Sequence, residues 1–291
     1  MSVQDSGEKT LQWRGHSIPV QSKYAKIQVN RILKGQTSES AIIFEFVKTI
    51  RMSIGFADVR VGQFGMFFLK RNTKNGLTVT DYYYPYVVAT AAVPKTASGD
   101  FERVIAEVTN VLAQPQATLT EKIKAIDILD QIDTPIVLES LLLNANSENI
   151  SIKIRSVTAL LRRNNISKLD VAEKILLAPP TSIDSYLIGN LARALEGIKD
   201  PNAIPTLGRL LESHNIALRY SSAYAIRHTG VDAAIKPLTK ALYDNDQNVR
   251  YQAVMGLAEI TRQYSWGPAL DQYNSNEQHY LNYWRNWAAK R

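Results

Sequence analysis

The chain of 291 residues contains no cysteine. Without a thiol it cannot use a cysteine nucleophile, a Cys-ligated zinc ion, an iron–sulfur cluster or a disulfide scaffold. Long apolar runs are also missing, because stretches such as Ile42–Phe44 and Met66–Leu69 are interrupted by charge within a few positions. Since a membrane-spanning helix needs roughly 18 to 20 consecutive apolar residues, we expect a soluble protein.

Motifs for familiar catalytic chemistry are absent as well. The sequence has no Gly-x-Ser-x-Gly, no phosphate-binding glycine loop and no dinucleotide-binding fingerprint. Acidic pairs such as Asp127 with Asp130 fall where solvated helix faces or caps are expected, and nothing in the sequence buries them. The four histidines lack the spacing of metal ligands; they are His16, His214, His228 and His279. We therefore predict no catalytic residue, no metal and no cofactor.

From Gly99 onward the apolar residues recur with the period of a helix. Five segments share one template. Small or apolar residues stand three and four positions after the first residue, and a large apolar residue stands seven positions after it. Their first residues, Lys122, Lys153, Ile188, Arg219 and Arg250, are separated by 31, 35, 31 and 31 residues. Another amphipathic helix precedes each segment, so each repeat is predicted to be an antiparallel helix pair.

A helix pair cannot bury its own apolar face, so neighbouring pairs must stack. We therefore predict a right-handed α-solenoid of about five to six helix pairs over residues 99–291. Gly197 and Gly230 fall where left-handed residues would end helices. The last segment departs from the template, and its aromatic side chains predict a helix that caps the core; they belong to Tyr280, Tyr283, Trp284 and Trp287.

Two features of the array resemble the HEAT family. Pro205 and Pro237 lie in or near the first turn of a leading helix, and Arg219 and Arg250 open the second helix after a polar turn. The period of about 31 residues is most similar to the short HEAT-like repeats of phycobilisome-lyase type. The resemblance implies that these arginines, with turn acids such as Asp246, form the ladder that joins neighbouring HEAT repeats.

The first hundred residues alternate with a period of about two, which predicts short strands at 24–33, 41–47, 62–70 and 77–82. We expect a small β-barrel over residues 13–94, a flexible segment at 1–12 and a linker at 94–99. The order of these strands resembles an OB-type barrel of the netrin or metalloproteinase-inhibitor-like kind. Cys-free versions of that barrel in bacterial cell-envelope proteins are the closer analogy, which implies a periplasmic, envelope or secreted location, although residues 1–8 contain no leader.

Two surfaces are candidates for binding. The first is the exposed side of the second helices, which is concave in solenoids and grips extended partners; we assign to it Asp127, Thr158, Arg193, Tyr220, Tyr224, Arg227, Tyr251 and Met255. The second is the surface of the barrel, where basic and aromatic residues gather; we assign to it Lys34, Arg60, Lys70, Arg71, Lys74, Tyr82 and Tyr84. Solvated helix faces, and packing of the tyrosines against the solenoid, are the alternatives without a binding role.

The formal charge of +7 is concentrated in the barrel. Residues 1–99 hold 13 Lys and Arg against 6 Asp and Glu, whereas residues 100–291 hold 21 of each. We therefore favour a non-catalytic scaffold that binds a protein partner through the concave face, with the basic barrel as a second docking module. The alternatives are nucleic-acid binding through the barrel, a HEAT-like DNA glycosylase and a bilin-lyase-type enzyme.

Overall fold

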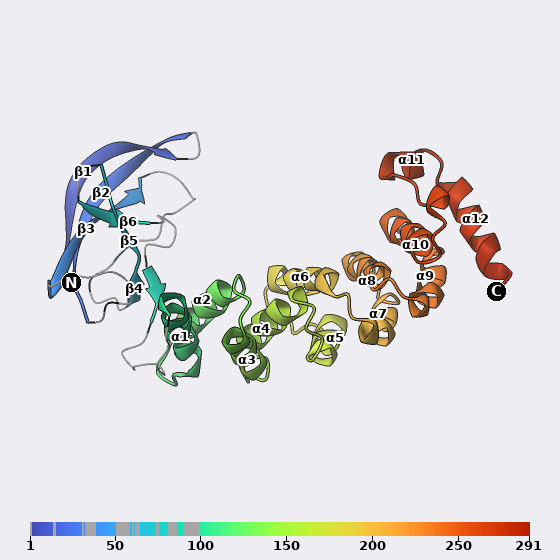
Figure 1. Cartoon of the computed structure of the whole chain (residues 1–291), viewed down its shortest axis with the longest axis horizontal. Helices are drawn as coiled ribbons and strands as arrows, with labels where there is room; N and C mark the ends of the chain where they lie inside the picture. The colour runs from blue at the N-terminus through green and yellow to red at the C-terminus, as the bar shows by residue number, and fades with distance from the viewer. Residues whose placement is uncertain are drawn as a thin grey trace. The chain divides into compact units, whose positions relative to one another are not determined.

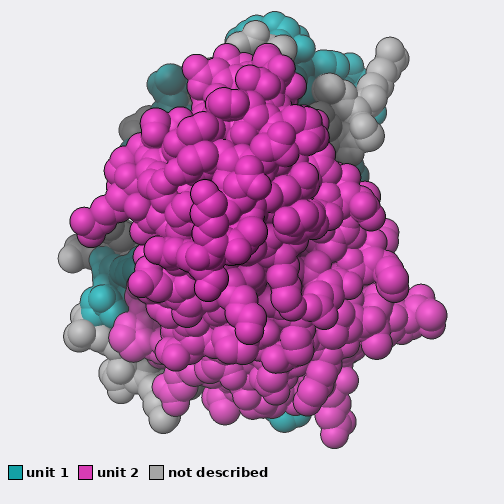
Figure 2. Space-filling view, turned by 90° about the vertical axis from the view of Figure 1, so that its right-hand side faces the viewer, with its two compact units in different colours: residues 1–132 teal, residues 133–291 magenta. Residues whose placement is uncertain are grey.

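The computed structural model describes residues 2–13, 16–30, 32, 39–50, 59, 61, 65–73, 76–80, 86–89 and 99–291. The chain divides into two compact units, Met1–Ile132 and Asp133–Arg291, which Figure 2 shows in different colours. The boundary therefore differs from the predicted linker at 94–99. The reason is that helices α1 (Asp100–Ala113) and α2 (Leu119–Leu129) contact strand β7 (Tyr86–Val88) and so belong to the first unit.

The first unit contains a five-stranded sheet in the order β1-β2-β3-β6-β5 and a two-stranded sheet of β4 and β7 (Figure 1). Neighbouring strands are antiparallel except β3 and β6, which pair in parallel at Glu45 and Thr78. The closed barrel is not confirmed, because β1 and β5 are the edges of the sheet and no described strand joins them. The strands are β1 Ser2–Trp13, β2 His16–Gln28, β3 Ala41–Thr49, β4 Gly65–Phe67, β5 Leu69–Arg71 and β6 Leu77–Val79.

The prediction of a flexible segment at residues 1–12 was wrong. Residues 2–13 form the edge strand β1, which pairs with β2 along its whole length and has one irregularity at Gly7, where φ is +105°. Most β1 side chains are exposed, so the strand lacks the apolar alternation that would have revealed it. Its backbone pairing with β2 orders it instead. The strand predicted at 24–33 likewise begins earlier, at His16, and ends at Gln28.

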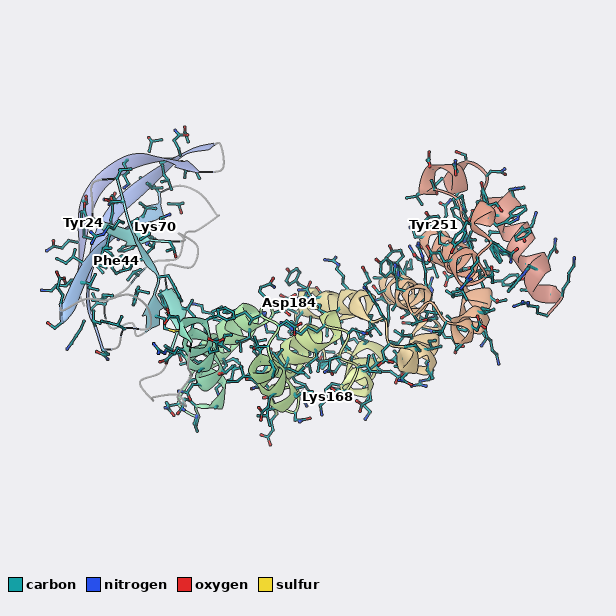
Figure 3. All side chains as sticks on the ribbon, viewed as in Figure 1. Tyr24, Phe44, Lys70, Lys168, Asp184 and Tyr251 are labelled. Carbon is teal, nitrogen blue, oxygen red and sulfur yellow. The ribbon has the colours of Figure 1, made fainter. Side chains whose placement is uncertain are left out.

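The sheet has a buried cluster on each of its two faces. In β2 the buried side chains of Ile18 and Val20 alternate in one phase, and those of Ala25 and Ile27 in the other. Pairing of β2 with β3 continues without interruption, so the two sets point to opposite faces. The larger cluster includes Phe44, which is labelled in Figure 3.

The helices form six consecutive pairs, α1 and α2 in the first unit and the rest in the second (Figure 1). A β sheet followed by a HEAT-like array of helix pairs is thus confirmed. Figure 1 shows α4, α6, α8 and α10 in one row, on the inside of the curve that the second unit makes, and α3, α5, α7 and α9 in an outer row. The helices of the second unit are α3 Pro135–Asn144, α4 Ile150–Arg162, α5 Leu169–Leu177, α6 Ser185–Ala194, α7 Ile204–Leu210, α8 Ile216–His228, α9 Ile235–Ala241, α10 Gln247–Ile260, α11 Leu270–Ser275 and α12 Glu277–Ala289.

Each inner helix begins at a residue whose side chain caps it. Asn149, Asp184, Asn215 and Asp246 precede α4, α6, α8 and α10, and each side chain accepts a hydrogen bond from a backbone N–H of the first turn. Such caps satisfy amide groups that have no partner inside the helix. Since these positions repeat in step with the predicted template, the sequence itself sets where every inner helix starts.

Arginines at the start of α8 and α10 connect successive repeats. Arg219 forms a two-pronged ion pair with Asp244, with Nε to Oδ2 2.7 Å and Nη2 to Oδ1 3.0 Å. Arg250 is the equivalent residue one repeat later, and its Nε donates to Glu277 Oε1 at 2.8 Å. Both also donate to turn carbonyls that precede their own helix. The ladder implied by the resemblance is present. Its acids are Asp244, which pairs with Arg219, and Glu277, which pairs with Arg250, whereas Asp246 caps α10.

Of the two glycines predicted to end helices as left-handed residues, only Gly230 does so. Gly230 has φ +66° and ends α8 in the left-handed region, as expected. Gly197 has no such angle, and a Cβ there would lie 2.8 Å from Arg162 Cα, so it permits close backbone approach. Gly256 in α10 is equally crowded, since a Cβ would lie 2.7 Å from Leu238 Cδ1 and 3.1 Å from Arg227 Cβ.

The aromatic residues of α12 close the end of the second unit. Trp284 is fully buried, and its indole N–H donates to the carbonyl of Trp266 at 3.0 Å. Tyr283 stacks on the Trp266 ring, with centroids 3.6 Å apart and planes 5° apart. The final helix thus covers the apolar end that a repeat array would otherwise expose.

The crowding at Gly256 predicts that Gly256→Ala lowers the free energy of unfolding by about 1–3 kcal/mol, because the added methyl group has no room. Gly208→Ala in α7 is the matched control, since no heavy atom lies within 4 Å of the Cβ position. There the better helix propensity of alanine should raise stability by about 0.5–1 kcal/mol. Urea unfolding of both variants tests this, and equal effects would contradict it.

The seam between α6 and α8 lacks a ladder pair, because Ile188 and Ser213 stand where Arg219 and Asp244 stand one repeat later. We predict that Ile188→Arg and Ser213→Asp together install it. The double-mutant cycle should give a favourable coupling of about 0.5–3 kcal/mol, measured by thermal and urea unfolding. Ile188→Arg alone should destabilise, since its charge then lacks an acid. A coupling near zero would show that the ladder depends on more than these two residues.

Candidate binding face

The inner sides of α8 and α10 carry a connected group of tyrosine, arginine and glutamine side chains. Arg227 on α8 donates from Nε to Glu259 Oε2 on α10 at 2.8 Å, and from Nη1 to Gln252 Oε1 at 2.9 Å. Gln252 in turn donates to the hydroxyl of Tyr220 on α8 at 3.4 Å, a long contact. These bonds link two helices from successive repeats. We call Tyr220, Tyr224, Arg227, Tyr251 and Met255, together with Arg193 on α6, the inner face.

Aromatic contacts order the rest of this face. Tyr224 stacks on His228 one turn later, with ring centroids 4.0 Å apart, and lies 6.4 Å from the Tyr220 ring. Tyr251, labelled in Figure 3, donates from its hydroxyl to the carbonyl of Pro268 at 3.2 Å and packs against the buried Tyr273. The tyrosines of the face are half-buried, so each keeps part of its ring accessible while its position is held.

The surroundings of Tyr220 and Tyr251 disfavour ionisation of their phenols. Burial raises the pKa of Tyr220, and the nearby Glu196 carboxylate raises it further. Burial also raises the pKa of Tyr251. Burial opposes ionisation of Arg227, but the hydrogen bond and charge of Glu259 outweigh it, so the pKa of Arg227 is raised. The face therefore combines neutral phenols with an arginine whose charge is already matched.

The structure brings together most of the residues that the sequence assigned to this face. Tyr220, Tyr224 and Arg227 lie on α8, Tyr251 and Met255 on α10, and exposed Arg193 on α6. Thr158 on α4 was wrongly assigned, because it is only 5% exposed and its hydroxyl has no hydrogen-bond partner among the described residues. A short side chain at this position does not reach beyond its neighbours. Asp127 is exposed on α2, which belongs to the first unit.

Sequence reasoning missed the residues that hold the face together. Gln252 is 5% exposed, and its amide connects Arg227 with Tyr220. Glu259 lies 32 positions after Arg227, close to one repeat, and this offset was the available signal. Ser221 donates to Glu196 at 2.8 Å and so joins α8 to the turn after α6. Polar partners one repeat apart are visible only when the repeats are placed side by side.

The basic surface assigned to the first unit is described only in part. Lys70, labelled in Figure 3, and Arg71 lie on β5 and are exposed. Lys34, Arg60, Lys74, Tyr82 and Tyr84 lie outside the described residues. Elsewhere on the sheet, Lys9 pairs with Glu45 and Lys23 with Asp5.

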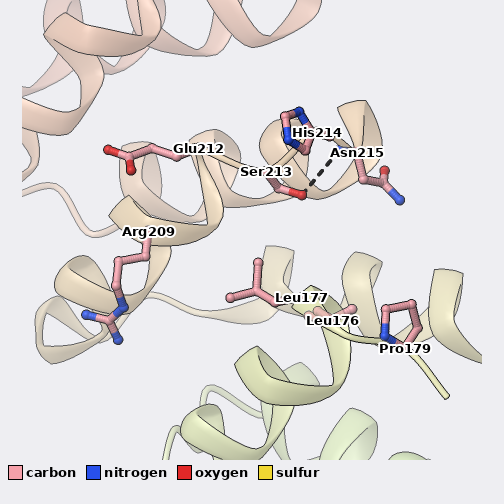
Figure 4. A pocket seen from close by; sticks show the side chains of 8 residues that line it. All are labelled: Leu176, Leu177, Pro179, Arg209, Glu212, Ser213, His214 and Asn215. Carbon is pink, nitrogen blue, oxygen red and sulfur yellow. Dashed lines mark hydrogen bonds between the residues drawn. The ribbon is translucent and has the colours of Figure 1, made fainter.

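One open hollow of about 390 Å³ lies at the seam without a ladder pair (Figure 4). Its arginine is already engaged, since Arg209 forms a two-pronged ion pair with Glu173 at 2.6 and 2.9 Å. That hydrogen bond and charge lower the pKa of Glu173. Of its other polar side chains, Glu212 pairs with Lys240, and Ser213 Oγ accepts from the Asn215 amide. Its lining residues are Leu176, Leu177, Pro179, Arg209, Glu212, Ser213, His214 and Asn215.

Two further kinds of site are absent from the described part of the chain. Among the described residues, no three His, Asp or Glu side chains gather closely enough to hold a metal ion. Within that same part, no helix has the length and apolar character needed to cross a bilayer.

Residues 181–258 match the family profile of HEAT repeats. The match begins just before α6 and ends within α10, and so contains the seam between α6 and α8 and the tyrosines of the inner face. The helical part of the chain is thus a HEAT-like repeat array. No curated protein is significantly similar to the chain in sequence.

Solved structures with similar backbones include two engineered proteins, at 19% and 21% identity with TM-scores of 0.38 and 0.37. The matches cover 56% and 58% of this chain, and 83% and 51% of those proteins. Human deoxyhypusine hydroxylase in complex with glycerol is 18% identical, with a TM-score of 0.29 over 65% of this chain and 73% of the hydroxylase. At these TM-scores no activity transfers to this chain.

The network predicts that Arg227→Met destabilises the second unit by about 1–3 kcal/mol, because Glu259 and Gln252 lose their partner. Arg193→Met removes the same charge from the same face. It should change the free energy of unfolding by less than about 0.5 kcal/mol, because Arg193 is exposed. Urea unfolding measures both values. If the two variants were equally stable, the hydrogen bonds of Arg227 to Glu259 and Gln252 would not be what orders the inner face.

Proposed function

We propose that this protein is a non-catalytic interaction protein whose inner face binds a polypeptide partner. The observation that carries the proposal is the row of half-buried tyrosines on α8 and α10, which lies beside the hydrogen bonds that Arg227 makes to Gln252 and Glu259 across successive repeats. Gln252 contacts Tyr220, His228 stacks on Tyr224, and the Pro268 carbonyl accepts from Tyr251. Stacked repeats create extended surfaces of this kind, and such surfaces suit extended partners.

The chemistry of the face supports protein recognition. Tyrosine and arginine are enriched among the residues that dominate binding energy, because they give large contact areas with polar ends. Side chains already fixed by hydrogen bonds and stacking lose little conformational freedom when a partner binds. The hydroxyls of Tyr220 and Tyr224 provide donors and acceptors for a peptide backbone.

The first unit is proposed as a second docking module. Residues 1–99 of this unit carry 13 Lys and Arg against 6 Asp and Glu, and exposed Lys70 and Arg71 lie on an edge strand. A basic surface of this kind attracts an acidic partner or an anionic surface. The netrin-like barrel and a location in the bacterial cell envelope belong to the same proposal, and their support is the resemblance in the sequence.

Peptide selection tests the inner face directly. The full chain is used to select binders from a phage-displayed library of short random peptides, and the binders are then synthesised and measured by fluorescence anisotropy. Replacing Tyr224 and Tyr251 with alanine should weaken binding at least about tenfold, because two contact rings are lost. Tyr243→Ala is the matched control, since Tyr243 is 63% exposed and follows the outer helix α9.

Circular dichroism and urea unfolding establish that each variant is folded before its affinity is compared. Binding that survives the double substitution, or that falls equally with Tyr243→Ala, would contradict a binding role for the inner face.

A further inference from the structure

The inner row of helices is far more basic than the outer row. Within their bounds, α4, α6, α8 and α10 carry seven Lys and Arg residues and a single acid, Glu259. The outer helices α3, α5, α7 and α9 carry four basic and three acidic residues. Residues 100–291 hold 21 of each sign, so the overall neutrality conceals an excess of positive charge within the inner helices, and the acids that balance it lie mostly outside the two rows.

Three of the inner arginines are matched by acids within the array. Arg219 pairs with Asp244, Arg227 with Glu259 and Arg250 with Glu277. Asp244 shows how firmly such acids are engaged: burial disfavours its charge, yet hydrogen bonds from Arg219 and the Asp246 amide lower its pKa. These acids are therefore already occupied and offer little to a positively charged ligand.

Arg193 is different. It is exposed near the end of α6, and it forms no ion pair with any residue in the described part of the chain. It occupies the template position that Tyr224 occupies on α8, and α6 contacts α8 directly. A guanidinium available for binding thus lies on the same face as the tyrosines, one helix earlier.

We propose that the partner segment is acidic, with an Asp or Glu carboxylate bound by Arg193 and neighbouring residues lying over Tyr220, Tyr224 and Tyr251. This inference rests on the proposed function of the inner face. The guanidinium matches a carboxylate in two-pronged geometry, and neutral phenols beside it do not repel an anion. A basic segment would bring its charge towards Arg193 while Glu259 and Asp244 remain paired, so charge complementarity selects the acidic one.

The experiment uses the full chain and the peptides selected above. Selected sequences should contain more Asp and Glu than the starting library. Arg193→Glu should weaken the binding of an acidic peptide at least about tenfold, and added salt should weaken binding to the unchanged chain. Lys236→Glu on the outer helix α9 makes the same change of charge away from the face. It should alter affinity by less than about twofold, because a rim or remote charge acts weakly through screened solvent.

The possible outcomes separate the inference from the proposed function. Neutral or basic selected peptides that lose binding when Tyr224 and Tyr251 are replaced would overturn the inference and leave the binding face in place. Peptides unaffected by the tyrosine substitutions would overturn both. A single-stranded oligothymidine that binds more tightly than any acidic peptide, and releases on Arg193→Glu, would show that the guanidinium serves phosphate and would overturn the acidic-peptide assignment.

Discussion

The helices of this chain depend on one constraint. A single two-helix repeat leaves an apolar face exposed to water, so it is not stable alone. Within the second unit the inner helices therefore pack against one another, as α8 does with α6 and α10. Such close packing requires small residues at the seam, and the lack of space for a Cβ at Gly256 and Gly197 shows how near the neighbours lie. At the end of the array, the buried side chains of Trp284 and Tyr273 cover the apolar surface that another repeat would otherwise cover.

Stacking also creates the inner face. Residues about one repeat apart in the chain become neighbours, so a hydrogen bond from Arg227 to Glu259 joins two helices that are not consecutive. The ladder arginines use the same geometry at the helix starts, where Arg219 and Arg250 each join their own turn to the following repeat. Ion pairs between repeats and the chemistry of the inner face thus use the same periodic spacing, and Arg219 and Arg227, about two turns apart on α8, serve different purposes.

Charge is organised on two scales. Along the sequence, the excess of positive charge lies in residues 1–99. Across the array, it lies on the inner helices, where most arginines have a partner and Arg193 has none among the described residues. Arg193 therefore lies one inner helix before the tyrosines of the inner face, without an acid of its own among the described residues. Under the proposed function, that arrangement favours binding to a segment of matching character over non-specific attraction to any polyanion.

The sequence by itself determined the helical period, the pairing of helices and the starts of the inner helices, because these follow from local spacing of apolar and capping residues such as Asn215 and Asp246. It also placed Tyr220, Tyr224 and Tyr251 on one face. Only the tertiary structure decided that Thr158 is buried, that Asp244 rather than Asp246 receives Arg219, and that residues 2–13 are a strand. The reason is physical: burial, ion pairing and edge-strand order depend on what neighbouring repeats and strands place beside a residue, and no local pattern contains that information.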